Sequence, residues 1–234
     1  MKRANDPNLR ILETAVERLG SLADEFVFLG GCATGLLLTD VAAPPIRQTI
    51  DVDVIVQVLS KGEYYALSER LRQQKFKEDS SDDAPICRWT DGRVILDVMP
   101  TDPEILGFGN EWYEPAMMHA IEVDLPGGKI IRMISAPYFL ITKLEAFAGR
   151  GAGDFQMSHD IEDLVAVMDG RPVIVDEVSV SETALHTAIA DRFQALLLNS
   201  RFMDAVSGHL PTDEASQARV PLVINRMKQI AGIK

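Results

Sequence analysis

The sequence contains few cysteines and few histidines. Its two cysteines, Cys32 and Cys87, lie far apart in a chain of 234 residues, so they form neither a Cys-x-x-Cys motif nor a disulfide framework. A reducing compartment, the cytoplasm, fits this usage best. Only four histidines are present, and they are scattered, which argues against a histidine-rich zinc site.

Long apolar runs are also missing. No stretch approaches the ~18–20 apolar residues that a membrane span requires, and the polar start of the chain, residues 1–7, has no signal-peptide core. We therefore expect a cytoplasmic protein with no membrane partner. With 47% hydrophobic and 25% charged residues, the composition is that of an ordinary globular protein.

Positive charge is scarce. The chain has 23 lysines and arginines against 35 acidic residues, and its formal net charge is −12. Such an excess repels nucleic acid at long range unless a local basic patch compensates for it. Arg70, Arg72, Lys75 and Lys77 could form such a patch, but they also fit the solvent-exposed face of a helix.

The hydrophobic pattern changes character near residue 134. Before it, short apolar runs alternate with helical patterns, and Asp91-Gly92 and Pro126-Gly127-Gly128 are hairpin turn signals. After it, from Ser135, the pattern is helical. We predict an α+β fold with an α/β domain, residues 1–134, that contains a mixed β-sheet and flanking helices. A helical domain, residues 135–234, would pack against it and leave an active site in the cleft.

The individual elements follow from the same pattern. The predicted helices are 7–24, 33–38, 61–74, 137–149, 158–168, 180–198 and 213–230. The predicted strands are 26–29, 50–58, 86–90, 93–99, 120–125 and 129–134. The segment 102–118 is expected to be irregular.

The stretch from Gly30 to Asp53 carries the most chemical information. Asp51 and Asp53 are two residues apart on a predicted strand, so they project from the same face. Among valines and isoleucines, two ionised carboxylates are costly unless a divalent metal offsets the cost. The Gly30-Gly31 turn upstream offers backbone N–H groups to a phosphate. The alternatives are a surface edge strand with solvated acids and a plain strand-to-helix turn.

A third carboxylate, Asp97, lies within another apolar strand, where an unpaired charge is hard to justify. If that strand lies beside the strand of Asp51 and Asp53, three carboxylates converge. Oxygen ligands of this kind suit Mg²⁺, with one or two ions and Mn²⁺ as a substitute. Asp97 would then act as general base. Otherwise it is a residue at the edge of a hairpin.

This arrangement resembles the DNA polymerase β-type nucleotidyltransferase superfamily, in which a Gly-Gly or Gly-Ser turn precedes an Asp-x-Asp strand and a distal third Asp. The match is sharper with the AbiEii/MenT-type nucleotidyltransferases of bacterial toxin–antitoxin and abortive-infection systems. The residues that match the first motif are Gly30, Gly31, Ala33, Arg47, Thr49, Asp51 and Asp53. A later helical motif matches from Lys143 to Arg150, followed by Asp160 and Asp163. The resemblance covers roughly residues 26–170.

The resemblance implies a nucleotidyltransferase fold and the transfer of a nucleoside monophosphate from an NTP to an acceptor hydroxyl. Asp51, Asp53 and Asp97 would hold the metal. Lys143 would be catalytic and would bind the triphosphate. The other implied nucleotide-binding residues are Gly30, Gly31, Arg47, Thr49, Arg150 and Asp160, with Asp160 orienting Lys143 or Arg150. The implied partners are an NTP, tRNA as acceptor and a cognate antitoxin protein.

Other interpretations stay open at this stage. The acceptor could be a small molecule, as in aminoglycoside nucleotidyltransferases, or the chain could bind nucleotide without turnover. Lys143 and Arg150 could lie on an exposed helix face, with Asp160 and Asp163 merely pairing with nearby basic groups. Asp163 is interpreted as structural. Arg47 and Thr49 could simply brace the loop before the strand.

Overall fold

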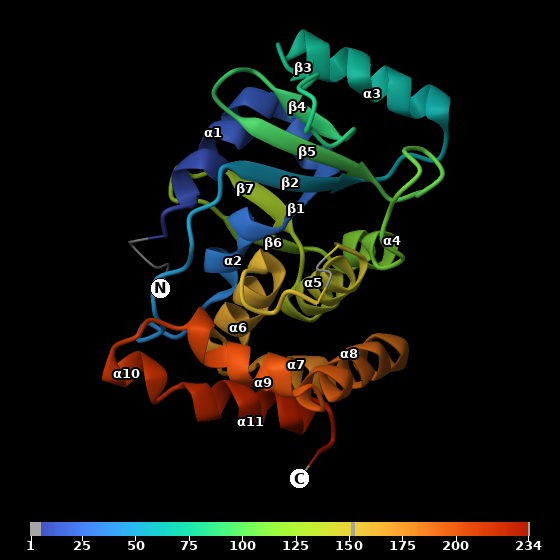
Figure 1. Cartoon of the computed structure of the whole chain (residues 1–234). Coiled ribbons are helices and arrows are strands. Elements are labelled where there is room, and N and C mark those ends of the chain that lie inside the picture. Colours follow the sequence, from blue (N-terminus) through green and yellow to red (C-terminus); the bar gives the residue numbers. More distant parts are fainter. Residues whose placement is uncertain (1–5, 151–152, 234) are drawn as a thin grey trace. The chain divides into compact units, whose positions relative to one another are not determined.

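The structure, a computed structural model, describes residues 6–150 and 153–233 and divides into two compact units (Figure 1). The sheet unit comprises Pro7–Ala33 and Arg47–Ser135. The helical unit comprises Asp6, Thr34–Ile46 and the described chain from Ala136 onward. Helix α2 (Gly31–Leu37) begins in the sheet unit and ends in the helical unit.

Within the described residues, the sheet unit contains one mixed sheet of seven strands in the order β3-β4-β5-β2-β1-β7-β6. The strands are β1 (Phe26–Leu29), β2 (Asp51–Val56), β3 (Lys77–Glu78), β4 (Arg88–Thr90), β5 (Ile95–Pro100), β6 (Ile121–Asp124) and β7 (Ile130–Met133). Strand β2 runs parallel to β5 and antiparallel to β1, while β1 runs parallel to β7. The predicted hairpins are present as the antiparallel pairs β4–β5 and β6–β7.

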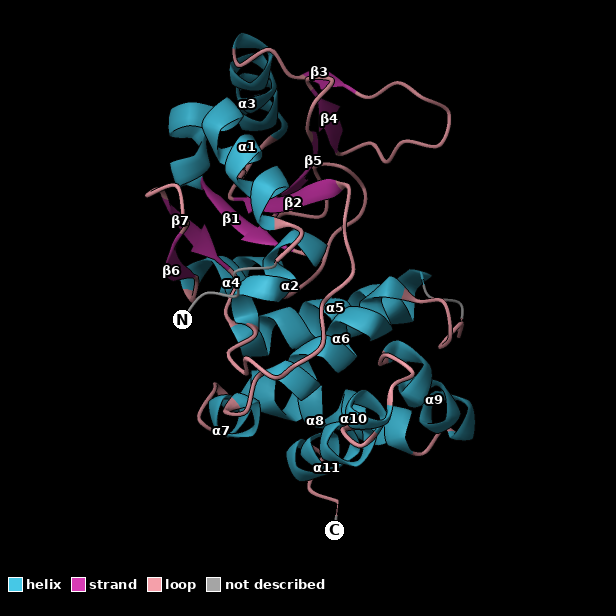
Figure 2. Cartoon of the chain, turned by 90° about the vertical axis from the view of Figure 1, so that its left-hand side faces the viewer, coloured by secondary structure: helices cyan, strands magenta, loops and turns pink. Residues whose placement is uncertain are grey.

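The helices of the sheet unit lie on both sides of the sheet, with α1 and α3 on one side and α4 on the other (Figures 1 and 2). They are α1 (Leu9–Leu19), which continues into a 3₁₀ segment (Gly20–Glu25), α3 (Lys61–Gln73) and α4 (Tyr113–Met118). Helix α1 buries an apolar stripe and packs against β2. Ser60 caps the N-terminus of helix α3: its side chain accepts a hydrogen bond from the backbone N–H of Glu63.

Helix α4 corrects the prediction that residues 102–118 are irregular. It has six residues, too few to show a helical period in the sequence. Its apolar side buries Ala116 and Met117, and the Tyr113 hydroxyl lies 3.2 Å from the Met99 sulfur of β5. Tertiary packing, which the local pattern does not reveal, therefore stabilises this helix.

The helical unit is built around packed pairs of helices, chiefly α5 with α6 and α8, and α11 with α6, α7 and α8. Its helices are α5 (Ala136–Arg150), α6 (His159–Gly170), α7 (Ile174–Ser179), α8 (Thr183–Leu197), α9 (Ser200–Ala205), a 3₁₀ segment (Val206–His209), α10 (Glu214–Gln217) and α11 (Val220–Ile230). Two predicted helices were too long. The helix predicted over 213–230 is interrupted before α11, which has Pro221 in its first turn, and the helix predicted over 180–198 starts at Thr183. The sequence analysis also missed α7 and α9, two short helices of six residues each.

Helix length and hydrophobicity bear on the membrane question. Within residues 6–150 and 153–233, none of the helices has the length and apolar character needed to cross a membrane.

Candidate active site

Three carboxylates converge on one face of the sheet. Asp53 of β2 pairs with Asp97 of β5 in the parallel register, and Asp51 stands two residues before Asp53. Register partners on neighbouring strands share a face, as do residues two apart on one strand. The two aspartate-bearing strands are therefore neighbours, which is the condition under which the sequence analysis expected the three carboxylates to converge.

Gly30 lies directly beneath the Asp53 side chain. Its φ of +70° is in the left-handed region, which favours glycine. A Cβ atom at this position would lie 2.6 Å from Asp53 Cγ and still closer to Oδ2. Both the backbone conformation and the placement of the Asp53 carboxylate therefore require glycine here.

Gly31 has the same relation to Arg47. A Cβ atom on Gly31 would lie 2.6 Å from Arg47 Nη2 and 3.3 Å from Thr49 Cβ. The glycine pair thus allows two charged side chains to approach the backbone closely. The turn signal in the sequence did not reveal this close approach of charged side chains. The contact of Gly30 and Gly31 with a phosphate stays a prediction.

Asn8 ties the glycine turn to the segment that leads into β2. Its amide nitrogen donates to the carbonyl oxygens of Gly31 at 3.3 Å and Arg47 at 3.1 Å, and its Oδ1 accepts from the backbone N–H of Thr49 at 2.9 Å. Asn8 is fully buried and stands at the N-cap position of α1, yet its side chain makes no cap hydrogen bond there. Sequence analysis missed it because its partners are backbone groups distant in sequence.

Thr49 connects this braced segment to the carboxylates. Its buried hydroxyl donates to Asp51 Oδ1 at 2.6 Å, and this bond fixes the orientation of the Asp51 side chain. This contact agrees with the alternative that Thr49 braces the segment before the strand, and it ends on a predicted metal ligand. The predicted nucleotide contact of Thr49 stays a prediction.

Arg88, which sequence analysis did not single out, contacts two of the three carboxylates. It begins β4 and is the register partner of Asp97. Its Nε and Nη2 donate to Oδ1 and Oδ2 of Asp97, both at 2.8 Å, and Nη2 also donates to Asp51 Oδ2 at 3.2 Å. The hydrogen bonds to Asp97 raise the pKa of Arg88 further above its usual range, so the guanidinium stays charged. Counting outward from a two-residue Asp91-Gly92 turn would pair Arg88 with Ile95. In the structure Thr90 pairs with Ile95, so residues 91–94 form the loop and Arg88 faces Asp97. The turn signal therefore did not reveal this contact.

The donor set can be compared with what a divalent cation requires. Carboxylate oxygens are the ligands that Mg²⁺ prefers, so the three aspartates fit the chemistry of such an ion. Across residues 6–150 and 153–233, however, no group of three or more His, Cys, Asp or Glu side chains has an arrangement that could hold a metal ion. The donors suit a metal, while Arg88 determines the arrangement of Asp51 and Asp97.

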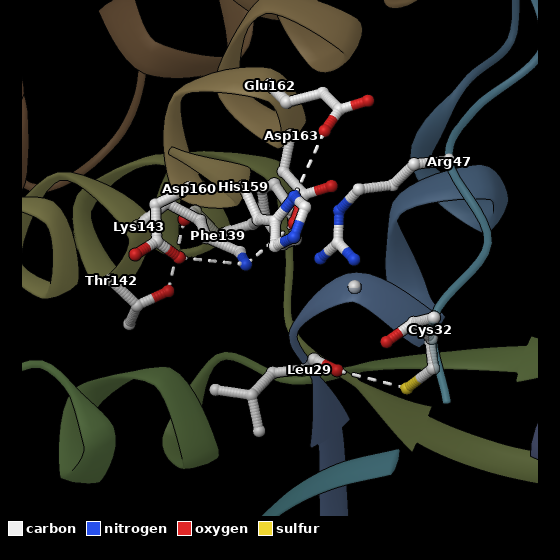
Figure 3. Close-up of polar contacts among 12 residues, drawn as sticks. Leu29, Cys32, Arg47, Phe139, Thr142, Lys143, His159, Asp160, Glu162 and Asp163 are labelled. Carbon is white, nitrogen blue, oxygen red and sulfur yellow. Dashed lines mark hydrogen bonds and ion pairs between the residues drawn. The ribbon is translucent and has the colours of Figure 1, made fainter. Parts of the chain in front are cut away.

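The two cysteines of the sheet unit are both buried. The Cys32 thiol donates to the carbonyl oxygen of Leu29 at 3.1 Å (Figure 3). Burial, reinforced by the negative charges of Asp97 and Asp53, raises the pKa of Cys87 to about 12. The environment of Cys87 therefore does not favour a thiolate nucleophile.

A pocket lies toward the opposite ends of β2 and β5 from Asp51. It is lined by Gln57, Thr101, Glu114, Met117, Met118 and Arg132. None of these residues belongs to the predicted site, so the pocket does not coincide with the carboxylates.

The helical unit contains a second charged cluster, in which α5 and α6 face each other. Lys143 Nζ lies 2.7 Å from Asp163 Oδ2 and 3.1 Å from Asp160 Oδ1 (Figure 3). Arg150 Nε and Nη2 donate to the two oxygens of Asp160 at 3.2 and 3.1 Å. Asp160 therefore contacts both cations, whereas Asp163, interpreted from the sequence as structural, lies closer to Lys143 than Asp160 does.

The two cations of this cluster differ in exposure. The side chain of Lys143 is 9% exposed and that of Arg150 is 72% exposed, so the alternative of an exposed helix face is wrong for Lys143. Burial alone would raise the pKa of Asp160, but Lys143 and Arg150 outweigh it and hold that pKa below its usual range. Asp160 is thus an ionised, buried carboxylate.

Comparison with known proteins bears on the fold. No family model matches the sequence, and no curated protein matches it either. The crystal structure of an antigenic nucleotidyltransferase-like protein from Paracoccidioides brasiliensis aligns with 87% of this chain and 94% of its own, with a TM-score of 0.50 and 20% sequence identity. The chain has a nucleotidyltransferase-like fold.

A looser alignment is found with JHP933 from Helicobacter pylori. It covers 95% of this chain and 90% of that one, with 9% identity and a TM-score of 0.45. The mixed sheet and the alignment with the Paracoccidioides brasiliensis protein confirm the prediction of an α+β, nucleotidyltransferase-like fold. Membership of the AbiEii/MenT-type family stays a prediction.

Proposed function

We propose that this chain is a metal-dependent nucleotidyltransferase that moves a nucleoside monophosphate from an NTP to an acceptor hydroxyl. The observation that carries the proposal is the register of Asp53 with Asp97, with Asp51 two residues upstream on the same face. The nucleotidyltransferase-like fold supports it. The close approach of Asp53 to Gly30 supports it further, since the turn is built around a carboxylate.

The chemistry needs one bond to form and one to break. The acceptor oxygen attacks the α-phosphorus, the bond from that phosphorus to the bridging oxygen breaks, and pyrophosphate leaves. Asp97 accepts the proton of the attacking hydroxyl. Mg²⁺ or Mn²⁺, held by Asp51, Asp53 and Asp97, would neutralise the polyphosphate charge. Thr49 orients Asp51, and the glycine turn positions Asp53, so both carboxylates are preorganised.

The phosphate-binding roles of Lys143 and Arg150 are part of this proposal and rest on the sequence resemblance. A lysine provides a compact charge for a phosphate, and an arginine provides a planar fork. Their contacts with Asp160 supply the restraint that such a role requires. Arg47, held beside Gly31, is proposed as a further nucleotide contact.

The acceptor is the least constrained part of the proposal. The resemblance favours tRNA and a toxin-like enzyme that a cognate antitoxin neutralises. The net charge of −12 favours the second candidate, a small-molecule acceptor, because acidic proteins repel RNA at long range. Induced expression in a bacterial host tests the toxin role, which requires growth arrest by the native chain and none by Asp53→Asn.

The proposal is tested by incubating the protein with Mg²⁺, each α-³²P-labelled NTP in turn, and total bacterial RNA. We expect labelled RNA with the native chain and none with Asp53→Asn, a change that keeps side-chain size but removes the charge. Asp124→Asn, at the exposed end of β6, is the matched control and should retain activity.

The outcomes separate the alternatives. Nucleotide binding without labelled RNA would redirect the search to small-molecule acceptors. Nucleotide binding without turnover on any acceptor would support the catalytically silent alternative. Equal labelling by the native chain and Asp53→Asn would contradict the proposed mechanism.

A further inference from the structure

The guanidinium of Arg88 lies between two carboxylates that the proposed function assigns to a metal. Its Nη2 atom is 2.8 Å from Asp97 Oδ2 and 3.2 Å from Asp51 Oδ2. A cation that binds both carboxylates would have to lie next to the same two oxygens. Mg²⁺ binds oxygen ligands at about 2.0–2.1 Å, so it cannot share this position with a guanidinium nitrogen.

The hydrogen bonds of the two carboxylates reinforce this arrangement. Asp97 accepts from Arg88 on both oxygens, while Asp51 accepts from Arg88 on Oδ2 and from Thr49 on Oδ1. All four oxygens thus already accept a hydrogen bond. Paired, bidentate contacts of this kind are the stronger class of charged hydrogen bond. Asp97 is buried, so removing its cationic partner without replacing it is costly.

We propose that Arg88 is an internal counter-ion that competes with divalent metal for Asp51 and Asp97. This inference rests on the proposed function, because it concerns the regulation of the same site. The metal binds only when the guanidinium leaves the carboxylates, and Arg88 therefore sets the metal affinity of the site. The side chain of Arg88 is 20% exposed, so it can leave toward solvent while the β4 backbone stays in place.

The test measures Mn²⁺ binding to the full chain by electron paramagnetic resonance, without nucleotide. We expect Arg88→Gln to bind Mn²⁺ at least about tenfold more tightly than the native chain, since its carboxylates have lost a competing cation. Arg93→Gln is the matched control. Arg93 is exposed at the turn of the same hairpin, so its loss removes one positive charge but no contact with the carboxylates, and we expect an affinity within about twofold of native.

A second variant separates direct competition from charge alone. Arg88→Lys keeps the charge but cannot form the bidentate fork, so its Mn²⁺ affinity should lie between those of the native chain and Arg88→Gln. It also keeps the test open if Arg88→Gln does not fold. Thermal unfolding gives an independent readout, in which Mn²⁺ should raise the Tm of either Arg88 variant more than that of the native chain.

The possible failures can be told apart. If the native chain and both Arg88 variants bind Mn²⁺ equally, and Asp97→Asn abolishes that binding, the role of Arg88 is refuted and the metal site stands. If neither the native chain nor either Arg88 variant binds Mn²⁺, the metal site of the proposed function is refuted. The proposed competition between Arg88 and the metal is then refuted as well. If Arg93→Gln tightens Mn²⁺ binding as much as Arg88→Gln does, the gain in affinity comes from net charge alone. That result would also overturn the proposal.

Discussion

Replacing Gly30 by alanine adds one methyl group, and we expect this group to displace the Asp53 carboxylate from the candidate site. The added Cβ would stand 2.6 Å from Asp53 Cγ, whereas carbon atoms in contact are normally about 3.5–4.0 Å apart. Either the Asp53 side chain moves by about 1 Å or the turn shifts by a similar amount. In both cases one carboxylate leaves the arrangement that Asp97 and Asp51 share.

The expected magnitudes follow from two separate costs. A residue with a Cβ in the left-handed region costs about 1–2 kcal/mol, and forcing a side chain off its preferred rotamer costs about 0.5–1.5 kcal/mol. We therefore expect Gly30→Ala to lower the free energy of unfolding by about 1.5–3.5 kcal/mol. A displacement of 1 Å at a reacting group can reduce the rate about 100-fold, and we expect a loss of that order in nucleotidyl transfer.

Gly92 provides the control that separates the two costs. Its φ is +85°, and a Cβ there would meet nothing within 4 Å. Gly92→Ala should lower stability by about 1–2 kcal/mol and leave activity unchanged. Urea unfolding of both variants, with transfer assays on the folded proteins, makes the comparison. If Gly30→Ala behaves like Gly92→Ala in both measurements, the Asp53 carboxylate does not depend on the glycine, and this reasoning is refuted.

Three further predictions concern the charged groups. Lys143→Met should lower the free energy of unfolding by about 3–5 kcal/mol, because it leaves buried carboxylates without this cation, and adding Asp163→Asn should restore part of that loss in urea unfolding. The lowered pKa of Asp160 stabilises the fold fully above the unfolded value of about 3.9, and this stabilisation disappears as the pH falls through the folded value. The test measures the difference in free energy of unfolding between the native chain and Asp160→Asn from pH 6 to pH 3. This difference should be constant above about pH 5 and shrink below about pH 4. A difference that grows on acidification would contradict the assignment. Gly31→Ala should raise the KM for NTP with less than about 1 kcal/mol lost in stability, because the flexible end of Arg47 has to move while Thr49 Cβ, at 3.3 Å, gives by only a few tenths of an ångström. An unchanged KM would argue against a nucleotide contact by Arg47.

Much of the sheet unit could be predicted because its local signals agree with its tertiary structure. The strand predicted at residues 26–29 matches β1, and both hairpins form where Asp91-Gly92 and residues 126–128 indicated them. The neighbouring position of strands β2 and β5 entered the sequence analysis only as the condition under which Asp51, Asp53 and Asp97 converge, and the parallel register meets that condition. A carboxylate in an apolar strand is costly without a partner, so a local sequence pattern can indicate a contact with a residue that is distant in sequence.

The short helices could not be predicted in the same way. Helices α4, α7 and α9 have six residues each, and an isolated helix of that length is unstable in water. They persist because they bury residues such as Met117, Ile174 and Phe202 in the cores of their units. The contacts that stabilise them come from residues distant in sequence, so hydrophobic periodicity within the segment does not reveal them.

The site residues that the sequence did not reveal each contact a group that the sequence had already placed in the candidate site. Arg88 pairs with Asp97 and Asp51, and Asn8 fixes backbone groups around the glycine turn. A suspected carboxylate raises two questions, namely what it binds and what balances its charge when that ligand is absent. The sequence motif indicates a metal as the ligand, but it does not indicate which group balances the charge of the carboxylate in the absence of that metal. Because a buried aspartate such as Asp97 would be costly without a cation, a basic residue such as Arg88 should be sought on the neighbouring strand wherever a metal motif lies in an apolar strand. The turn motif alone does not identify that residue, since the observed register differs by two residues from the one that a two-residue Asp91-Gly92 turn would give.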